Sequence, residues 1–395
     1  MEIENKIVLL SSKINPSEKE LDELNGLLSE VEDWEAVAER LMLCSTAPLF
    51  YLKAPSLSNL KLMPDEEFQK IRKSYYYTLT RGTLMYQVLK KTMEVLKANG
   101  IDAIVLKGAY LAEALYKDVG LRLFSDIDLL VKEEQANRAF DLLLNAGFTQ
   151  AKKADQMLEF LVKNMNYEHL PQLVYKGISI ELHVRLHGVE TKYKFFPQKM
   201  WENVEKTKLG GVTVYTPDLP DLLIHTILHL NKHFCDGEIQ FTGFNDIVNI
   251  LEIWCDELDW TEIIRRSIQY ECEDIVFKFL VLVHRNYKAY VPDFIILEYI
   301  GYLDDEEQEL FEKYLSGFKG EHFSVVGCVN RVKNLHSFPK KIRYVLWMIF
   351  PSKNYMIRFY QIKNPNLYLF YYPCRFWLGI KGLFRFAKLK IGKKK

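Results

Sequence analysis

The sequence predicts an α+β protein in which helices flank a mixed β-sheet. Helical periodicity dominates residues 14–98 and returns over residues 218–316, whereas strand-like runs occur between residues 101 and 217. This order of patterns divides the chain into four regions. They are a helical N-terminal region (1–98), a strand-rich region (99–217), a second helical region (218–320) and a C-terminal tail (321–395).

Length and composition indicate a globular protein. A chain of 395 residues can bury a sizeable core and hold two or three domains. Its six cysteines are scattered without a C-x-x-C pair, which argues against a disulfide framework or a zinc knuckle. The first ten residues carry charges where a signal peptide would be apolar, and no apolar run reaches the ~18 residues of a spanning helix. The sequence therefore favours a cytoplasmic protein.

The chain is organised around residues 101–131. We expect a buried strand over residues 101–106, a turn at Lys107-Gly108, a helix over 109–116 and a second strand that begins near Asp126. Successive strand side chains alternate, so Asp126 and Asp128 share one face while Ile127 enters the core. Two adjacent carboxylates are costly unless a positive charge lies between them. A divalent metal ion is the obvious candidate.

The N-terminal region is predicted to form helices that cover the sheet. Ser17 and Glu20 have the spacing of a capping box, and a second helix is expected over residues 34–44. A long third helix, over residues 64–97, ends at Asn99-Gly100, which is a favourable C-terminal cap. None of these patterns indicates catalysis.

Further elements follow the Asp-x-Asp strand. Helices are expected over residues 133–145 and, less clearly, 155–163, and a short strand over 212–215. The runs 169–175 and 178–186 are predicted to form a hairpin across Lys176-Gly177. Alternation in the second run places Glu181, His183 and Arg185 on one face. A third carboxylate therefore lies on a strand that can pair with the Asp126 strand.

A helix expected over residues 218–233 carries His225, His229 and His233 at four-residue spacing, so the three imidazoles share one helix face. A zinc site is one interpretation, and a structural or substrate-facing row is the favoured one. The helix expected next, over residues 244–255, contains Asp246, which can cap or pair with His229.

The motifs resemble those of a known superfamily. The runs are Leu106-Lys107-Gly108, Tyr116, Gly120-Leu121-Arg122, residues 126–131 (DIDLLV) and Glu181-Leu182-His183. Together they are similar to the nucleotidyltransferases that include DNA polymerase β, and more closely to a bacterial family of uncharacterised nucleotidyltransferases. The resemblance covers roughly residues 70–260 and implies a nucleotidyltransferase-like mixed sheet. One departure is that Lys107-Gly108 replaces the usual Gly-Ser, so the Ser that would touch phosphate is absent.

The resemblance also implies roles for single residues. Asp126 and Asp128 would bind Mg²⁺ or Mn²⁺, with Glu181 as the third metal-binding carboxylate and a candidate base. Lys107, Gly108 and Arg122 would contact the phosphates of an NTP co-substrate, in agreement with a cation and a small residue at a helix N-terminus. His183 and His229 are assigned to the nucleotide site, with a supporting or core role as the alternative. Lys107 as a surface lysine and Arg122 as a loop charge also remain open.

The tail has a distinct charge and composition. No Asp or Glu follows Glu321, while 16 Lys and Arg do, which leaves 36 basic against 52 acidic residues upstream. Aromatic residues alternate with these bases, as in segments that lie at a membrane interface. An anionic membrane surface contacted by residues 331–395 is the favoured partner. Nucleic acid and the acidic body of the protein are the alternatives.

These observations predict a metal-dependent nucleotidyltransferase. It would move an NMP group from NTP to a hydroxyl or phosphate of a small-molecule, sugar, lipid-linked or peptide acceptor, and an envelope polysaccharide precursor would suit a tail at the inner face of the membrane. The alternative is a non-catalytic scaffold that keeps the fold and binds a nucleotide or a protein partner.

Overall fold

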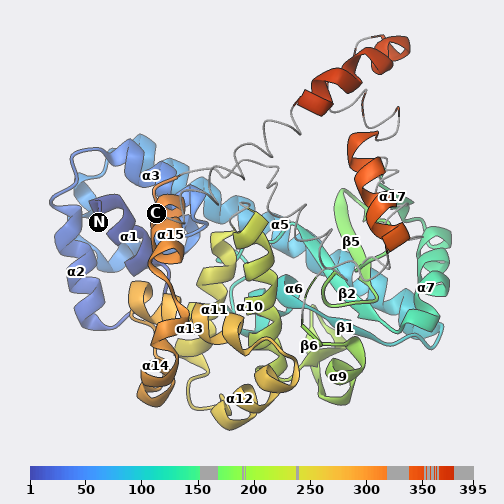
Figure 1. Ribbon diagram of the computed structural model, residues 1–395. Helices are drawn as coiled ribbons and strands as arrows, with labels where there is room; N and C mark the ends of the chain where they lie inside the picture. Colours follow the sequence, from blue (N-terminus) through green and yellow to red (C-terminus); the bar gives the residue numbers. More distant parts are fainter. Residues whose placement is uncertain are drawn as a thin grey trace.

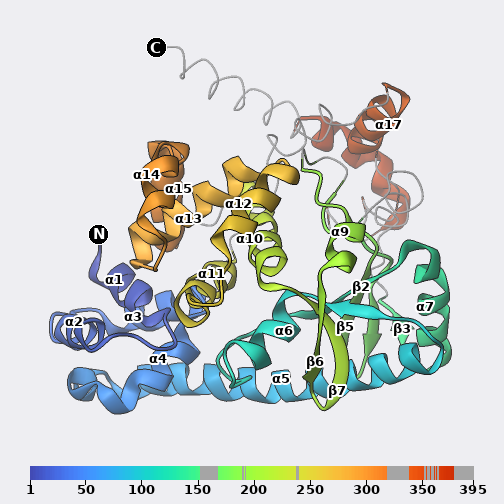
Figure 2. The same ribbon diagram turned by 90° about the horizontal axis from the view of Figure 1, so that it is seen from below.

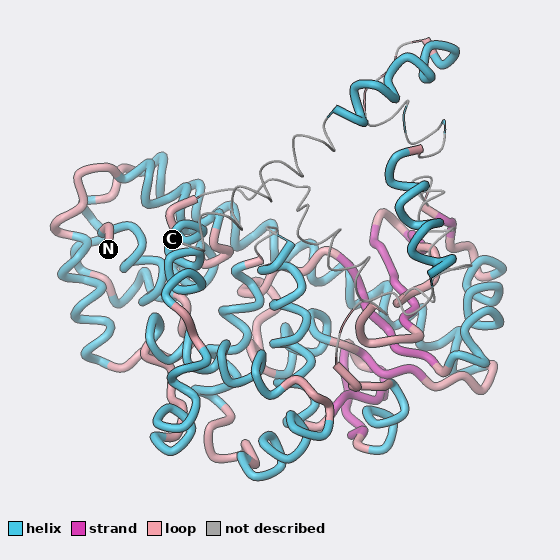
Figure 3. Tube along the Cα trace, in the orientation of Figure 1, coloured by secondary structure: helices cyan, strands magenta, loops and turns pink. Residues whose placement is uncertain are grey.

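A computed structural model of the chain describes residues 1–151, 168–188, 191, 193–236, 240–317, 338–350, 353, 356, 360, 362 and 364–377. Strands gather on one side of the molecule and helices make up the rest (Figure 1, Figure 3). The predicted α+β class is therefore confirmed. The helix expected over residues 155–163 lies outside the described residues.

Within the described residues, seven strands form one mixed sheet in the order β3-β4-β5-β2-β1-β7-β6. The strands are β1 (Ala103–Val105), β2 (Asp126–Val131), β3 (Thr149–Gln150), β4 (Leu173–Tyr175), β5 (Ile178–His183), β6 (Val204–Leu209) and β7 (Val212–Pro217). β2 pairs in parallel with β5 and antiparallel with β1, and β1 pairs in parallel with β7. The centre of the sheet is thus the strand that carries Asp126 and Asp128.

Two hairpins flank this centre. β4 and β5 are joined by Lys176-Gly177, both with positive φ, as predicted for this turn. β6 and β7 are joined by Gly210-Gly211, again with positive φ at both residues. β6 was not predicted from the sequence, although a Gly-Gly pair between strand-like runs is a hairpin signal.

The N-terminal helices pack around one long helix. They are α1 (Ile3–Ser11), α2 (Glu18–Leu28), α3 (Trp34–Leu43), α4 (Ala47–Lys53), the short 3₁₀ helices η1 (Ala54–Ser56) and η2 (Ser58–Leu62), and α5 (Asp65–Ala98). The capping box of Ser17 and Glu20 is present at the start of α2, as predicted. α5 packs against α3 and α4 at one end and against β2, β5 and β7 farther along. It therefore ties the helical region to the sheet, beneath which it runs in Figure 2.

Helices also connect and cover the strands. α6 (Lys107–Ala114) links β1 to the loop before β2, α7 (Glu133–Asn145) follows β2, and α9 (Pro197–Glu202) precedes β6. α6 begins at Lys107, so the turn expected at Lys107-Gly108 is wrong. These two residues form the first turn of the helix, and the strand before them is shorter than predicted.

A second helical group follows the sheet. It contains α10 (Leu219–Asp236), α11 (Phe241–Ile253), α12 (Trp260–Gln269), α13 (Glu273–Tyr287), α14 (Asp293–Tyr299), η3 (Ile300–Tyr302) and α15 (Asp305–Leu315). α10 packs against α11, α12 and α13 and also against β7, while α13 reaches α1. One buried apolar cluster extends from Ile7 to Leu315 and joins both helical groups to the sheet.

The described part of the tail contains α17 (Phe338–Ile349) and η4 (Pro365–Tyr371). Both views show α17 on the side of the molecule opposite α1, α2 and α3 (Figure 1, Figure 2). Among the helices that the structure describes, none has the length and apolar character needed to cross a membrane.

Candidate metal and nucleotide site

The pairing of β2 with β5 brings three carboxylates together. The parallel register sets Asp128 beside Glu181 and Asp126 beside Ser179. Because neighbouring strands lie only ~5 Å apart and alternate residues share a face, Asp126, Asp128 and Glu181 project from the same side of the sheet. The prediction that the Glu181 strand pairs with the Asp126 strand is confirmed.

Asp128 is buried and engages a cation with each oxygen. Lys107 Nζ lies 3.0 Å from Oδ2, and His183 Nε2 lies 2.9 Å from Oδ1. Burial alone would raise the pKa of Asp128, but the Lys107 ammonium and the His183 imidazolium hold that pKa well below its usual range. Asp128 is therefore ionised at neutral pH.

Asp126 has the opposite electrostatic character. Ser125 Oγ donates a hydrogen bond to Oδ1 at 3.0 Å, and among the described residues no Lys, Arg or His lies within ion-pair distance of this carboxylate. Burial, together with repulsion from Asp128 and Glu181, raises the pKa of Asp126 to about 6. Asp126 is the carboxylate that most lacks a counter-charge.

Polar neighbours fix the orientation of Glu181. Gln172 Nε2 donates to Oε1 at 3.2 Å, and the Nε2 atoms of His169 and His183 lie 3.4 and 3.6 Å from Oε2. Burial would raise the pKa of Glu181, but the two imidazoles lower it below its usual value. Sequence patterns did not single out His169 and Gln172, because neither belongs to a motif. The signal was their place in the strand-like run before the hairpin.

His183 bridges the carboxylates of two strands. Burial would lower the pKa of this imidazole, but its contacts with Asp128 and Glu181 raise the pKa to about 9. Protonated His183 thus supplies a positive charge between Asp128 and Glu181. Lys107 and His183 thus supply positive charge beside Asp128, while the divalent metal ion expected between Asp126 and Asp128 stays a prediction.

The same side chains can hold a divalent metal ion. One potential ligand atom from each of Asp128, Glu181 and His183 lies within 4.8 Å of the other two. Among the described residues, this is the group of three side chains close enough together to share one metal ion. Asp126 lies two residues from Asp128 on the same face, and within the described part of the chain it forms no ion pair. Carboxylate oxygens are the ligands that Mg²⁺ and Mn²⁺ prefer. The carboxylates of Asp126, Asp128 and Glu181 therefore fit such an ion, whereas His183 in its protonated form orients them and does not bind the metal.

Lys107 reaches Asp128 from the first turn of α6. Its φ of +42° is unusual for a residue with a side chain. At Gly108, a Cβ atom would lie 2.8 Å from Arg122 Nη1 and 2.9 Å from the Cβ of Phe124. Only glycine fits this close approach, so Gly108 lets the start of α6 pack directly against the loop that leads to β2.

Arg122 lies in a buried ion pair. Its Nε donates to Asp246 Oδ1 at 2.7 Å and its Nη2 to Oδ2 at 2.6 Å, while Tyr116 Oη donates to Oδ1 at 3.0 Å. Arg122 Nη1, which points at Gly108, has no hydrogen-bond partner among the described residues. The structure thus joins Arg122 to the start of α6. Asp246, for which capping or pairing with His229 was one interpretation, pairs with Arg122 instead.

The histidine row of α10 also lies near this site. Burial, and then the Lys107 ammonium, lower the pKa of His225 and His229 well below the usual value. His229 and His233 face each other with their Nε2 atoms 3.3 Å apart. Lys232, also on α10, forms an ion pair of 2.9 Å with Glu168. Sequence patterns did not single out Glu168. Within the described residues, the histidine row does not form a three-ligand metal group.

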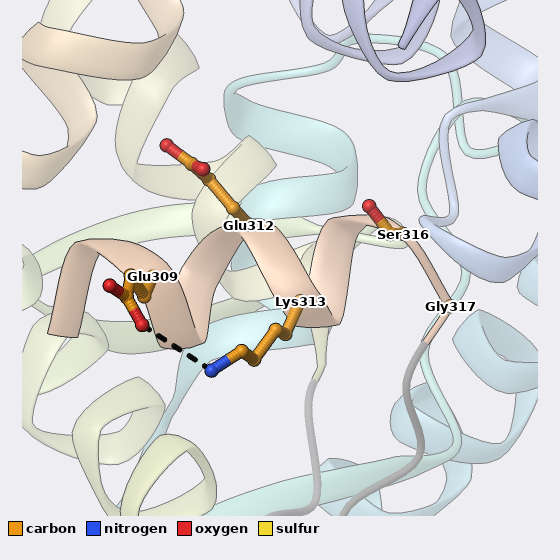
Figure 4. A pocket seen from close by; sticks show the side chains of 5 residues that line it. All are labelled: Glu309, Glu312, Lys313, Ser316 and Gly317. Atoms are coloured by element: carbon orange, nitrogen blue, oxygen red, sulfur yellow. Dashed lines mark hydrogen bonds and ion pairs between the residues drawn. The ribbon is translucent and has the colours of Figure 1, made fainter. Parts of the chain in front are cut away.

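A surface hollow on α15 is separate from these residues. It is lined by Glu309, Glu312, Lys313, Ser316 and Gly317, and Lys313 pairs with Glu309 across its edge (Figure 4). α15 lies on the opposite side of the molecule from β2 and β5 in both ribbon views (Figure 1, Figure 2). The hollow therefore contributes nothing to the carboxylate site.

Fold and site together define a class. A mixed sheet with acidic residues on two adjacent parallel strands is consistent with a nucleotidyltransferase-like fold. The chain belongs to the family described as "Uncharacterised nucleotidyltransferase", whose model matches residues 30–288. No curated protein and no solved structure has a significant match to the chain.

The buried pair of Arg122 and Asp246 predicts strongly coupled stability effects. Arg122→Met leaves the Asp246 carboxylate buried without its cation and should lower the free energy of unfolding by about 3–5 kcal/mol. The double variant Arg122→Met/Asp246→Asn removes both charges and keeps an acceptor for Tyr116, so it should recover most of this loss. Urea unfolding followed by circular dichroism measures the cycle. Additive losses would show that the two charges are not coupled.

The environment of His183 predicts a pH effect. A folded-state pKa of about 9, above the ordinary value of ~6.5, means that protonated His183 stabilises the fold fully below about pH 6.5 and loses this contribution as the pH rises through 9. NMR titration of the histidine rings should show one resonance with a pKa near 9 that His183→Gln abolishes. A wild-type His183 resonance that titrates near 6.5 would contradict the ion pairs with Asp128 and Glu181.

Proposed function

We propose that the protein is a metal-dependent nucleotidyltransferase that moves an NMP group from NTP to a hydroxyl or phosphate of an acceptor. The observation that carries this proposal is the set of three carboxylates on β2 and β5, next to Lys107 at the start of α6. Membership of a nucleotidyltransferase family supports it.

Asp126, Asp128 and Glu181 would hold Mg²⁺ or Mn²⁺. When bound, the ion would neutralise phosphate charge and stabilise the pyrophosphate leaving group. Asp126 gains most from such an ion, since repulsion from Asp128 and Glu181 contributes to its raised pKa. His183 Nε2 lies close enough to both Asp128 and Glu181 to orient these two carboxylates.

Lys107 is proposed to contact the phosphates of the nucleotide. Its ammonium lies 3.0 Å from Asp128, so it borders the space in front of the carboxylates. The free N–H groups at the start of α6 and the helix dipole favour an anion at the same place. Gly108 would allow a phosphate close to the backbone. Arg122 would support phosphate binding through its charge and through the contact of Nη1 with the first turn of α6.

Glu181 is proposed to take the proton of the attacking hydroxyl. Its pKa is lowered by the imidazoles of His183 and His169, so it is ionised and able to accept a proton at neutral pH. Gln172 donates a hydrogen bond to Oε1 of Glu181, and Oε2 lies beside the two imidazoles. His229, uncharged because of burial and the nearby Lys107, is proposed to line the nucleotide side of the site.

A non-catalytic scaffold is the second candidate, and one observation favours it. Both oxygens of Asp128 are engaged by Lys107 and His183, so this carboxylate is neutralised without a metal ion. Asp126→Asn separates the two candidates, since an enzyme would lose turnover while a scaffold would lose at most its affinity for metal. The acceptor would be a small molecule, sugar, peptide or lipid-linked intermediate.

A panel of nucleotides tests the proposal. ATP, GTP, CTP and UTP are titrated against the protein by calorimetry, with and without Mg²⁺ or Mn²⁺. We expect metal-dependent binding of at least one nucleotide, and we expect Asp128→Asn to weaken it about 100-fold or more, because metal sites lose 10–100-fold even when a supporting residue is removed.

Asp141→Asn is the matched control for this experiment. Asp141 is an exposed carboxylate on α7, so the substitution removes the same charge without touching the site. Equal binding by wild type and both variants would contradict a role for Asp128. Binding of no nucleotide with either metal would favour the scaffold.

A further inference from the structure

One face of α17 is apolar and exposed. Its members recur every four residues and so lie along one side of the helix. They are Phe338, Ile342 and Leu346, which are 74%, 45% and 52% exposed, and they are followed directly after the helix by Phe350, which is 61% exposed. An amphipathic helix in a globular protein normally buries such a face against the core. In α17 it is instead open to the surroundings.

A second exposed apolar group follows in the described part of the tail. Its members lie on η4 and on the helical turn after it, and they are Leu367, Leu369, Phe370, Phe376 and Trp377. In Figure 1 this segment extends beyond α17, away from the body of the molecule. Large exposed apolar residues are scattered singly on most proteins, whereas here two adjacent segments of the same tail carry them.

The charge of the tail favours an anionic partner. No Asp or Glu follows Glu321, and the α17 sequence includes Lys340, Lys341 and Arg343. A protein partner would have to match both the apolar face and the basic sequence of the same segment. A bilayer with anionic lipids satisfies both at once, since the acyl region accepts the apolar side chains and the headgroups attract Lys and Arg.

We propose that the exposed faces of α17 and residues 365–377 dock on an anionic membrane surface. Phe338, Ile342, Leu346 and Phe350 enter the interface together, with Phe370 and Trp377 as aromatic anchors at headgroup level. Docking of this kind leaves the body of the protein in the aqueous phase. If the proposed transferase activity holds, the acceptor is a molecule that is anchored in or made at the membrane, such as a lipid-linked sugar precursor.

Vesicle flotation with the full-length protein tests the docking surface. Wild type is expected to float with vesicles that contain phosphatidylglycerol and to remain at the bottom with phosphatidylcholine alone. Ile342→Glu/Leu346→Glu places two charges on the exposed face of α17 and should reduce binding to the anionic vesicles by about tenfold or more. Because both side chains are exposed, the fold should be unaffected.

The matched control is Leu62→Glu/Leu297→Glu. These leucines are also well exposed, lie outside the tail and bring the same change in net charge. The control should float like wild type. Equal flotation of both double variants, or binding to neutral vesicles as strong as to anionic ones, would overturn the proposal. So would RNA binding that Ile342→Glu/Leu346→Glu abolishes without any vesicle binding. None of these results depends on nucleotide transfer, so the membrane surface and the proposed activity can fail separately.

Discussion

The structure of the site depends on the repulsion among three carboxylates that the sheet forces together. Parallel pairing of β2 with β5 fixes Asp128 beside Glu181, and the pleat fixes Asp126 on the same face. Lys107 and His183 both contact Asp128, so the two aspartates have opposite pKa shifts although they are separated by a single residue. Among the described residues, two cations therefore contact Asp128, whereas none lies within ion-pair distance of Asp126. That imbalance makes a further cation favourable at this edge of the sheet.

The position of Lys107 depends in turn on how the first turn of α6 packs against its neighbours. The chain enters α6 with a positive φ at Lys107, and Gly108 then packs against Arg122 and Phe124 with no space for a side chain. Arg122 is held by Asp246 of α11, and Tyr116 hydrogen-bonds to the same carboxylate. The second helical group thus supports the start of α6. This coupling gives a physical reason for the Gly-Leu-Arg loop and for the Asp in α11.

Sequence periodicity predicted most of the architecture. The bounds of α7 were predicted to the residue, and the turn at Lys176-Gly177 and the pairing of the Glu181 strand were correct. The alternation of apolar and polar residues was sufficient to predict the strand that carries Glu181, because that strand has one apolar face. The start of α6 was misplaced, since nothing local shows that Lys107 adopts a helical position with positive φ. β6 was missed because Val204–Leu209 is rich in charged residues and lies at the edge of the sheet, where one side of a strand stays in water.

The site was less predictable than the fold. Motifs identified Asp126, Asp128 and Glu181, but they could not show that Lys107 and His183 both contact Asp128. Nor could they show His169 and Gln172 around Glu181, since these contacts depend on how β4 and the residues before it lie against β5. Arg122 was expected at the phosphates because its motif resembles that of the nucleotidyltransferases, whereas its buried pairing with Asp246 depends on the tertiary packing of α11.

Direct binding of Mn²⁺ tests the central claim most directly, since it needs neither the nucleotide nor the acceptor. Electron paramagnetic resonance measures free Mn²⁺ in titrations of wild type, Asp128→Asn and the exposed-carboxylate control Asp141→Asn. A site formed by Asp126, Asp128 and Glu181 predicts saturable binding by wild type and by the control, and its loss in Asp128→Asn. Saturable binding that Asp128→Asn leaves unchanged, or no binding by wild type, would contradict a metal site at these carboxylates.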